Sequence, residues 1–253
     1  MKLNLFKDKH PALVVKHNDL IQKSKFSLSL QQQKILLYII SKIKPTDTEF
    51  QEYTFTVKEF CRVCGIEDRE YKSIYEKVRQ AIKDIADKSV WLNIDGTDSL
   101  LRWIEKARIK DGVITIRLDD DMKPYLLGLK NNYTMYELVW ALNFKSKYSL
   151  RLYELVKSIH YNESNVYKRV YTVEELKQLI GGESYANFTD FKRRVLEPAI
   201  NEISETSDKI IEYEIKEKRG KTIYSIELKI YTLDNPVKVW GKTSKLKGNT
   251  DLK

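Results

Sequence analysis

An internal repeat constrains the fold of this 253-residue chain more than any other sequence feature. The segment TVKEFCRVCG (56–65) resembles TVEELKQLIG (172–181) in the second half of the chain. Each begins with Thr followed three residues later by Glu59 or Glu175, the pattern of a capping box. Each ends in Gly, the residue favoured just past a helix C-terminus. We therefore predict the same short helix twice.

The similarity extends on both sides of these short helices. Upstream, QQQKILLYIISKI (31–43) resembles KYSLRLYELVKSI (147–159), with apolar residues at helical spacing in both. Downstream, AIKDI (81–85) matches AINEI (199–203). Each half of the chain is thus predicted to contain a helix, a short helix and a longer helix, in that order.

Strand-like segments follow the longer helix in each half. They are rich in β-branched and aromatic residues, and Asp-Gly dipeptides at 95–96 and 111–112 predict turns. These segments are 90–94, 100–109 and 112–118 in the first half and 210–218 and 222–231 in the second. Two helices joined by a tight turn and followed by a β-hairpin form a winged helix, a relative of the helix-turn-helix DNA-binding unit. We therefore predict an α+β fold of two tandem winged-helix domains related by internal duplication.

The repeat also predicts the domain organisation. We expect an N-terminal arm (1–17), a first winged helix (18–130), a linker helix (131–142), a second winged helix (143–233) and a basic flexible tail (234–253).

The third helix of the second module, FTDFKRRVLEPAINEIS (188–204), is the candidate DNA-reading helix. Phe191, Val195, Ala199 and Ile203 recur every four residues and form an apolar stripe. At about 100° per residue, the opposite face presents three polar side chains, and a fourth polar side chain lies closer to the core. The first three, Thr189, Lys192 and Arg193, suit contacts in a major groove. The fourth, Arg194, suits a contact with a backbone phosphate.

Pro198 interrupts this helix. Proline cannot donate a hydrogen bond to the carbonyl of Arg194, so the helix is expected to kink or restart near Glu197. A groove-reading helix presents mainly its N-terminal turns, so the DNA-facing part would be little affected.

The hairpin tip KRGK (218–221) is the candidate wing of the second module. Lys218, Arg219 and Lys221 are expected to reach phosphates or the minor groove, although a merely solubilising turn would look the same.

In the first module, the matching helix (70–88) mixes its cations with Glu70, Glu76 and Asp84. We expect this module to contact phosphates and to read few bases, with a role in assembly as the alternative. The cations assigned to DNA here are Lys72, Arg79 and Lys83 of this helix and Lys23 and Lys25 before the module's first helix.

The net charge, together with the lack of an apolar targeting or membrane segment, indicates which partners and which compartment to expect. The net charge of +9 favours a polyanionic partner such as nucleic acid. The N-terminus MKLNLFKDKH lacks the continuous apolar region of a signal peptide. No stretch approaches the roughly 18 uninterrupted apolar residues of a membrane span. We expect a cytoplasmic protein with no membrane partner.

The residues do not suggest catalysis or a bound metal. Cys61 and Cys64 lack a second Cys or His pair that would complete a zinc site, so structural thiols are expected. The three His residues are too scattered to hold the metal that a Tyr-nucleophile nicking enzyme needs. No Gly-rich phosphate loop occurs. We predict no enzyme activity, no cofactor and no metal.

These motifs resemble a known family. NDLIQKSKFSLSLQQQKILLYII resembles the opening of the Rep-type, iteron-binding plasmid replication initiators, which contain two winged helices. SKYSLRLYELVKS, YTVEELKQLIG and FTDFKRRVLEPAINEISETSD are similar to that family's second module. The resemblance covers residues 15–233, and its last motif is the most specific part.

The resemblance implies a function. Such proteins bind direct repeats in double-stranded DNA at a plasmid origin as monomers, help to melt it and recruit host replication proteins such as the initiator and helicase. As homodimers joined through the first module, many repress their own gene. The family's recognition helix maps onto 187–200, which adds Asn187 to the expected DNA contacts, and its wing maps onto 218–221.

Two alternatives remain open from the residues. A winged-helix transcriptional repressor without an initiator role would share the fold and the charge, but would usually carry only one reading module. A protein-interaction scaffold would show no salt-dependent binding to duplex DNA. The internal duplication favours the initiator.

Overall fold

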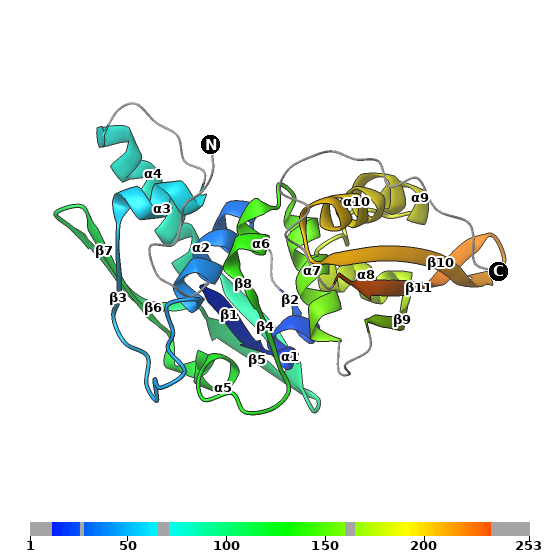
Figure 1. Ribbon diagram of the computed structural model, residues 1–253, viewed down its shortest axis with the longest axis horizontal. Helices are drawn as coiled ribbons and strands as arrows, with labels where there is room; N and C mark the ends of the chain where they lie inside the picture. Colours follow the sequence, from blue (N-terminus) through cyan, green and yellow to red (C-terminus); the bar gives the residue numbers. More distant parts are fainter. Residues whose placement is uncertain (1–11, 26–27, 65–70, 160–164, 234–253) are drawn as a thin grey trace.

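Two winged helices lie side by side along the longest axis of the molecule (Figure 1). The computed structural model describes residues 12–25, 28–64, 71–159 and 165–233. The first winged helix comprises α2 (Leu30–Ile40), β3 (Tyr53–Thr56), α3 (Val57–Cys64), α4 (Tyr71–Ala86), β6 (Ile104–Lys110) and β7 (Val113–Leu118). The second comprises α7 (Lys147–Ser158), β9 (Val166–Thr172), α8 (Val173–Ile180), α9 (Phe188–Phe191), a π-helical turn (Lys192–Leu196), α10 (Glu197–Thr206), β10 (Lys209–Arg219) and β11 (Thr222–Thr232).

The two winged helices share one topology. Their sheets have the strand orders β3-β7-β6 and β9-β11-β10, so in each the last strand of the hairpin lies in the middle. In each, the short strand β3 or β9 leads directly into the short helix α3 or α8. This agreement confirms the predicted α+β duplication.

The caps of the short helices account for part of the repeat. In α3, the Glu59 amide donates to Thr56 Oγ1 at 3.1 Å and the Thr56 amide donates to the Glu59 carboxylate at 2.8 Å, which confirms the capping box. In α8, the Glu175 amide donates to Thr172 Oγ1 at 3.1 Å. That helix ends at Gly181, whose φ of 80° is the left-handed conformation that glycine adopts without strain. The matching Gly65 lies outside the described residues.

The first half carries additional elements. These are β1 (Leu13–His17), α1 (Asn18–Gln22), β2 (Ser24–Lys25), β4 (Ser89–Ile94), β5 (Thr97–Arg102), a 3₁₀ turn (Asp120–Met122), α5 (Lys123–Leu126), β8 (Tyr133–Glu137) and α6 (Leu138–Asn143). The expected strand 100–109 divides at the buried Trp103: β5 pairs with β4, whereas β6 pairs with β7. The Asp-Gly turns at 95–96 and 111–112 are confirmed, with positive φ at all four residues.

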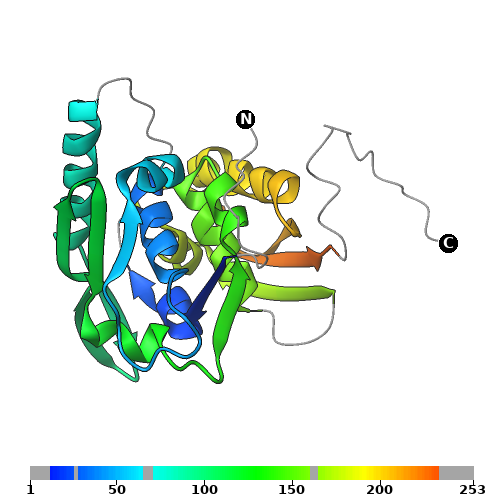
Figure 2. The same ribbon diagram turned by 60° about the vertical axis from the view of Figure 1, so that its left-hand side comes forward.

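The linker helix expected at 131–142 is wrong over residues 133–137, which form strand β8. Thr134 and Tyr136 are buried while Tyr133 and Met135 are exposed, so the segment has the period-two pattern of a strand. Helix α6 begins only at Leu138. The expected arm is also partly wrong, because residues 13–17 form β1, which pairs antiparallel with β8 (Figure 2). The expected tail (234–253) lies outside the described residues.

Helix α7 is buried along nearly its whole length. Leu150, Leu152, Tyr153, Leu155 and Val156 are at most 1% exposed. On one side α7 packs against α1, α2 and β8, and on the other it packs against α8 and α10. Buried residues from both winged helices form one continuous core through it. The two winged helices are therefore joined by packing as well as by the chain.

Buried Lys209 makes the stability of this core depend on pH. Its ammonium donates to Thr232 Oγ1 at 2.6 Å. Burial, reinforced by the nearby charge of Lys157, lowers its pKa to about 8. In the unfolded chain the pKa is about 10.4, so between these values the unfolded state binds more protons and the free energy of unfolding rises with pH. We expect Lys209→Met to remove this rise and to stabilise the fold at neutral pH.

Urea unfolding midpoints measured from neutral pH to about pH 10.4 would test this, with Lys218→Met at the exposed wing as the control. Parallel pH profiles for the wild type and Lys209→Met would contradict the assignment.

Candidate DNA-binding surface

The predicted reading helix has the expected two faces. Phe191, Val195, Ala199 and Ile203 are at most 1% exposed, which confirms the apolar stripe. Thr189 lies exposed on the other face. The side chains of Arg193 and Arg194 are 67% and 61% exposed. The helix thus presents a threonine and two arginines to solvent.

Pro198 is accommodated by a π-turn. The helix restarts at Glu197, as expected, and the Glu197 amide donates to the Lys192 carbonyl, five residues back. A π-turn takes up one extra residue, which alters the direction of the side chains around it. The expectation that Arg194 lies closer to the core is therefore wrong. Lys192 is the least exposed of the three cations, at 42%.

Lys192 is held against the wing strand. Its ammonium lies 3.4 Å from the Glu197 carboxylate, and the Tyr213 hydroxyl on β10 donates to that carboxylate at 3.1 Å. A hydrogen bond with Tyr213, followed by the Glu197 charge, raises the pKa of Lys192. Lys192 therefore links the reading helix to the hairpin beside it.

Asp190 organises the start of the reading helix. Asn187 caps α9: its Oδ1 accepts from the Asp190 amide at 2.8 Å and its Nδ2 donates to the Asp190 carboxylate at 2.9 Å. The same carboxylate lies 3.1 Å from Arg193 and 3.9 Å from Arg194. The Asn187 hydrogen bond, followed by the arginine contacts, lowers the pKa of Asp190. Exposed ion pairs of this kind are weak, so a nucleic acid can replace them.

The wing is an extended hairpin with a two-residue turn. Lys218, Arg219 and Lys221 are all exposed, and Gly220 has a φ of 61°. The Arg219 guanidinium stacks 3.2 Å from the centre of the Tyr224 ring and its Nε lies 2.9 Å from Glu217. These contacts orient one of the three tip cations.

A groove separates the reading helix from the wing. Asn187 and Thr189 line one side, and Lys221 and Tyr224 line the other. The structure therefore brings predicted residues from two distant segments together around one concave surface, as a helix and a wing that grip the same duplex would require.

The cations assigned to the first winged helix are more dispersed. On α4, Arg79 lies 3.4 Å from Glu76 and Lys83 lies 2.5 Å from Asp87, all exposed. The Lys72 side chain lies outside the described residues. The helix is thus as charge-diluted as the sequence indicated.

Lys23 and Lys25 lie apart from the α4 cations. Both line a groove between the β4–β5 turn, at Asp95, and helix α8, at Glu175. Lys23 lies 2.9 Å from Asp19. These two lysines therefore face a surface that carries acidic side chains as well.

The wing of the first half carries basic residues that were not among the predicted site residues. Lys106, Arg108 and Lys110 alternate along β6 and are exposed. Residues two apart on a strand share a face, so the three cations form one row. Arg108 lies 3.5 Å from Glu52. The alternation in EKARIK was visible in the sequence and would have identified the row.

Two winged helices, each with cations on its third helix and its wing, define this molecule as a tandem winged-helix protein of the DNA-binding type. Two family models match the chain: the initiator replication protein WH1 domain over residues 13–157 and the initiator Rep protein WH2 domain over residues 172–230. The chain belongs to this family of replication initiators. The WH1 match includes most of α7, the helix that packs against elements of both halves.

Individual relatives are distant. A replication initiation protein of Escherichia coli is 23% identical over 231 residues, 85% of this chain and 70% of the relative. The PI protein of Escherichia coli is 30% identical over 146 residues, 51% of this chain and 47% of the relative. The solved Pi initiator protein in complex with iteron DNA has a TM-score of 0.72 at 18% identity, covering 90% of this chain and all of that one.

Among the described residues, no helix combines the length and apolarity needed to cross a membrane.

Gly182 provides a test of how the reading helix is anchored. A Cβ at this position would lie 2.7 Å from the ring of Phe191, which is fully buried, so the ring and the helix that carries it would have to shift. We expect Gly182→Ala to destabilise the fold by about 1–3 kcal/mol through overpacking and to weaken DNA binding by displacing α9. Urea unfolding and binding titrations on the same preparations would measure both effects.

Gly181→Ala is the matched control, because a Cβ there meets open space and only the positive φ is strained. If both variants bound DNA equally well, Gly182 would not position the helix.

Proposed function

We propose that this initiator binds direct repeats in double-stranded DNA at a plasmid origin and starts replication there without catalysing a reaction itself. It acts in the cytoplasm and recruits host replication proteins such as the initiator and helicase. As a homodimer joined through the first winged helix, it represses its own gene.

One observation supports this proposal most strongly: each half has a third helix beside a wing, and the two halves share one core. In support, each half carries exposed cations on its third helix and on its wing, the two elements with which winged helices contact a duplex. The Pi initiator, which has the same fold, was solved in complex with iteron DNA. A protein with two such halves fits a DNA site that is long enough for both halves to contact it at once.

The two halves have different tasks in this proposal. Thr189, Arg193 and Arg194 of the second half read bases or adjacent phosphates, because arginine can form two hydrogen bonds with guanine. The first half carries a basic row on β6, which suits sequence-independent phosphate contacts.

Fluorescence anisotropy tests the proposal, with duplexes from the DNA flanking the gene and shuffled duplexes compared across a salt series. Preferential binding by about a thousandfold or more is expected for site-specific recognition. Equal, steeply salt-dependent binding would leave a general DNA-coating protein. Absence of binding at low salt would favour the interaction scaffold instead.

Arg193 is expected to read a base. Arg193→Ala should cost about 1–3 kcal/mol of binding free energy and relax specificity at one position of the site. Titration against a set of single-base variants of the preferred duplex would measure this. Arg102→Ala, at an exposed arginine on β5, is the control. A uniform loss across all duplexes would make Arg193 a phosphate contact.

The wings are expected to contact phosphates in both halves. Lys221→Ala and Lys110→Ala should each weaken binding to all duplexes alike and reduce the slope of log K against log salt by about one. Lys130→Ala, at an exposed loop lysine, should leave the slope unchanged. An unchanged slope for Lys110→Ala would remove the β6 row from the interface.

A further inference from the structure

A cluster of four buried polar side chains joins the β1–β8 ribbon to helix α7. Lys16 of β1, Tyr136 of β8, and Arg151 and Glu154 of α7 are at most 5% exposed. Lys16 pairs with Glu154 Oε1, and the Tyr136 hydroxyl donates to the same oxygen at 2.5 Å. Arg151 Nη1 lies 3.4 Å from Glu154 Oε2. One carboxylate thus collects three donors from three elements.

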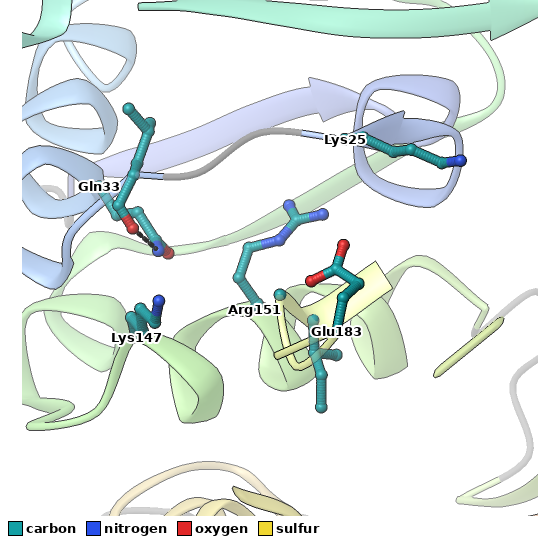
Figure 3. A pocket seen from close by; sticks show the side chains of 8 residues that line it. Lys25, Gln33, Lys147, Arg151 and Glu183 are labelled. Atoms are coloured by element: carbon teal, nitrogen blue, oxygen red, sulfur yellow. Dashed lines mark hydrogen bonds between the residues drawn. The ribbon is translucent and has the colours of Figure 1, made fainter. Parts of the chain in front are cut away.

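Arg151 extends this cluster into both halves of the molecule. Its Nη2 donates to the Ile21 carbonyl of α1 at 3.2 Å and to the Leu179 carbonyl of α8 at 3.0 Å. One guanidinium therefore bonds the backbone of the first half and that of the second. Figure 3 shows Arg151 in the cavity between the halves, with Lys25 of the first half and Lys147 and Glu183 of the second around it.

Stability alone does not explain this arrangement. Burying charges is costly, and well-packed apolar side chains of similar size often stabilise a fold equally well. Burial opposes ionisation of Glu154, but the charges of Lys16 and Arg151 outweigh it and hold the pKa of its carboxyl below its ordinary value. The charged form of Glu154 is therefore favoured, although burial lowers the pKa of Lys16 and of Arg151. Hydrogen bonds to a carboxylate are directional, whereas apolar contacts are not.

We propose that Arg151 and Glu154, with Lys16, are positioning residues that fix the angle between the two DNA-binding halves. This inference rests on the proposed function. When this angle is fixed and the second half is bound to its bases, the β6 row of the first half meets phosphates at one defined distance along the duplex. A rigid connection also raises the effective concentration of the first half at the DNA and so increases the affinity of the whole protein.

Hydroxyl-radical footprinting of the full chain on its preferred duplex tests the inference, because it separates the contacts of the two halves. Lys110→Ala identifies which protections belong to the first half. In Lys16→Met and Arg151→Lys, we expect the first-half protections to fade or spread while those of the second half persist. Affinity should fall about threefold to tenfold, as the avidity of linked sites is lost.

The matched control is Lys157→Met, which removes a cation from the same helix. Lys157 pairs with Asp208 at 3.0 Å, entirely within the second half, so its footprint should match that of the wild type. Gln22→Leu is a second test that leaves the buried charges intact, because Gln22 donates to the Ser158 carbonyl and hydroxyl across the same boundary. It should weaken the first-half protections in the same direction.

Thermal unfolding establishes that each variant is folded at the footprinting temperature. Folded variants with lowered melting temperatures but wild-type footprints would give the cluster a structural role only and overturn the inference. A wild-type protein without any site-specific footprint would instead refute the proposed function, so the two failures are distinguishable.

Discussion

The architecture depends on the burial of helix α7 from two sides. A helix at the surface of one domain keeps a polar face, but α7 is covered by α1, α2 and β8 on one side and by α8 and α10 on the other. Its polar residues Arg151 and Glu154 are therefore buried and must find partners within the protein. The partners come from β1, β8, α1 and α8, so the burial of one helix fixes how both halves meet.

The features that the sequence predicted correctly are governed by local chemistry. The complete capping box of α3, and the Thr172 half of it in α8, depend only on residues three apart in the chain. The Asp-Gly turns and the glycine after α8 require positive φ, which few other residues tolerate. The apolar stripe of the reading helix depends only on helical period. The duplication was recognisable because these signals occur twice in one order.

The features that the sequence did not predict depend on distant partners. Residues 133–137 form a strand because β1, more than a hundred residues earlier, pairs with them. The sequence around Lys16 does not indicate a buried partner, and only the fold places it against Glu154. The π-turn was anticipated only as a kink or restart, because the sequence shows that Pro198 lacks a donor but not how the turn before it adapts.

The third helix of each half pairs its cations with neighbouring carboxylates. In the second half, Asp190 holds Arg193 and Arg194, and Glu197 holds Lys192. Such pairs reduce the general attraction of the helix to any polyanion, since a phosphate must first displace the carboxylate. A guanine edge compensates for the lost ion pair, because it accepts two directed hydrogen bonds from arginine. A single phosphate contact at an incorrect site does not. In the proposed function, this pairing on the reading helix favours correct sites over incorrect ones, because specificity also arises from penalising alternatives.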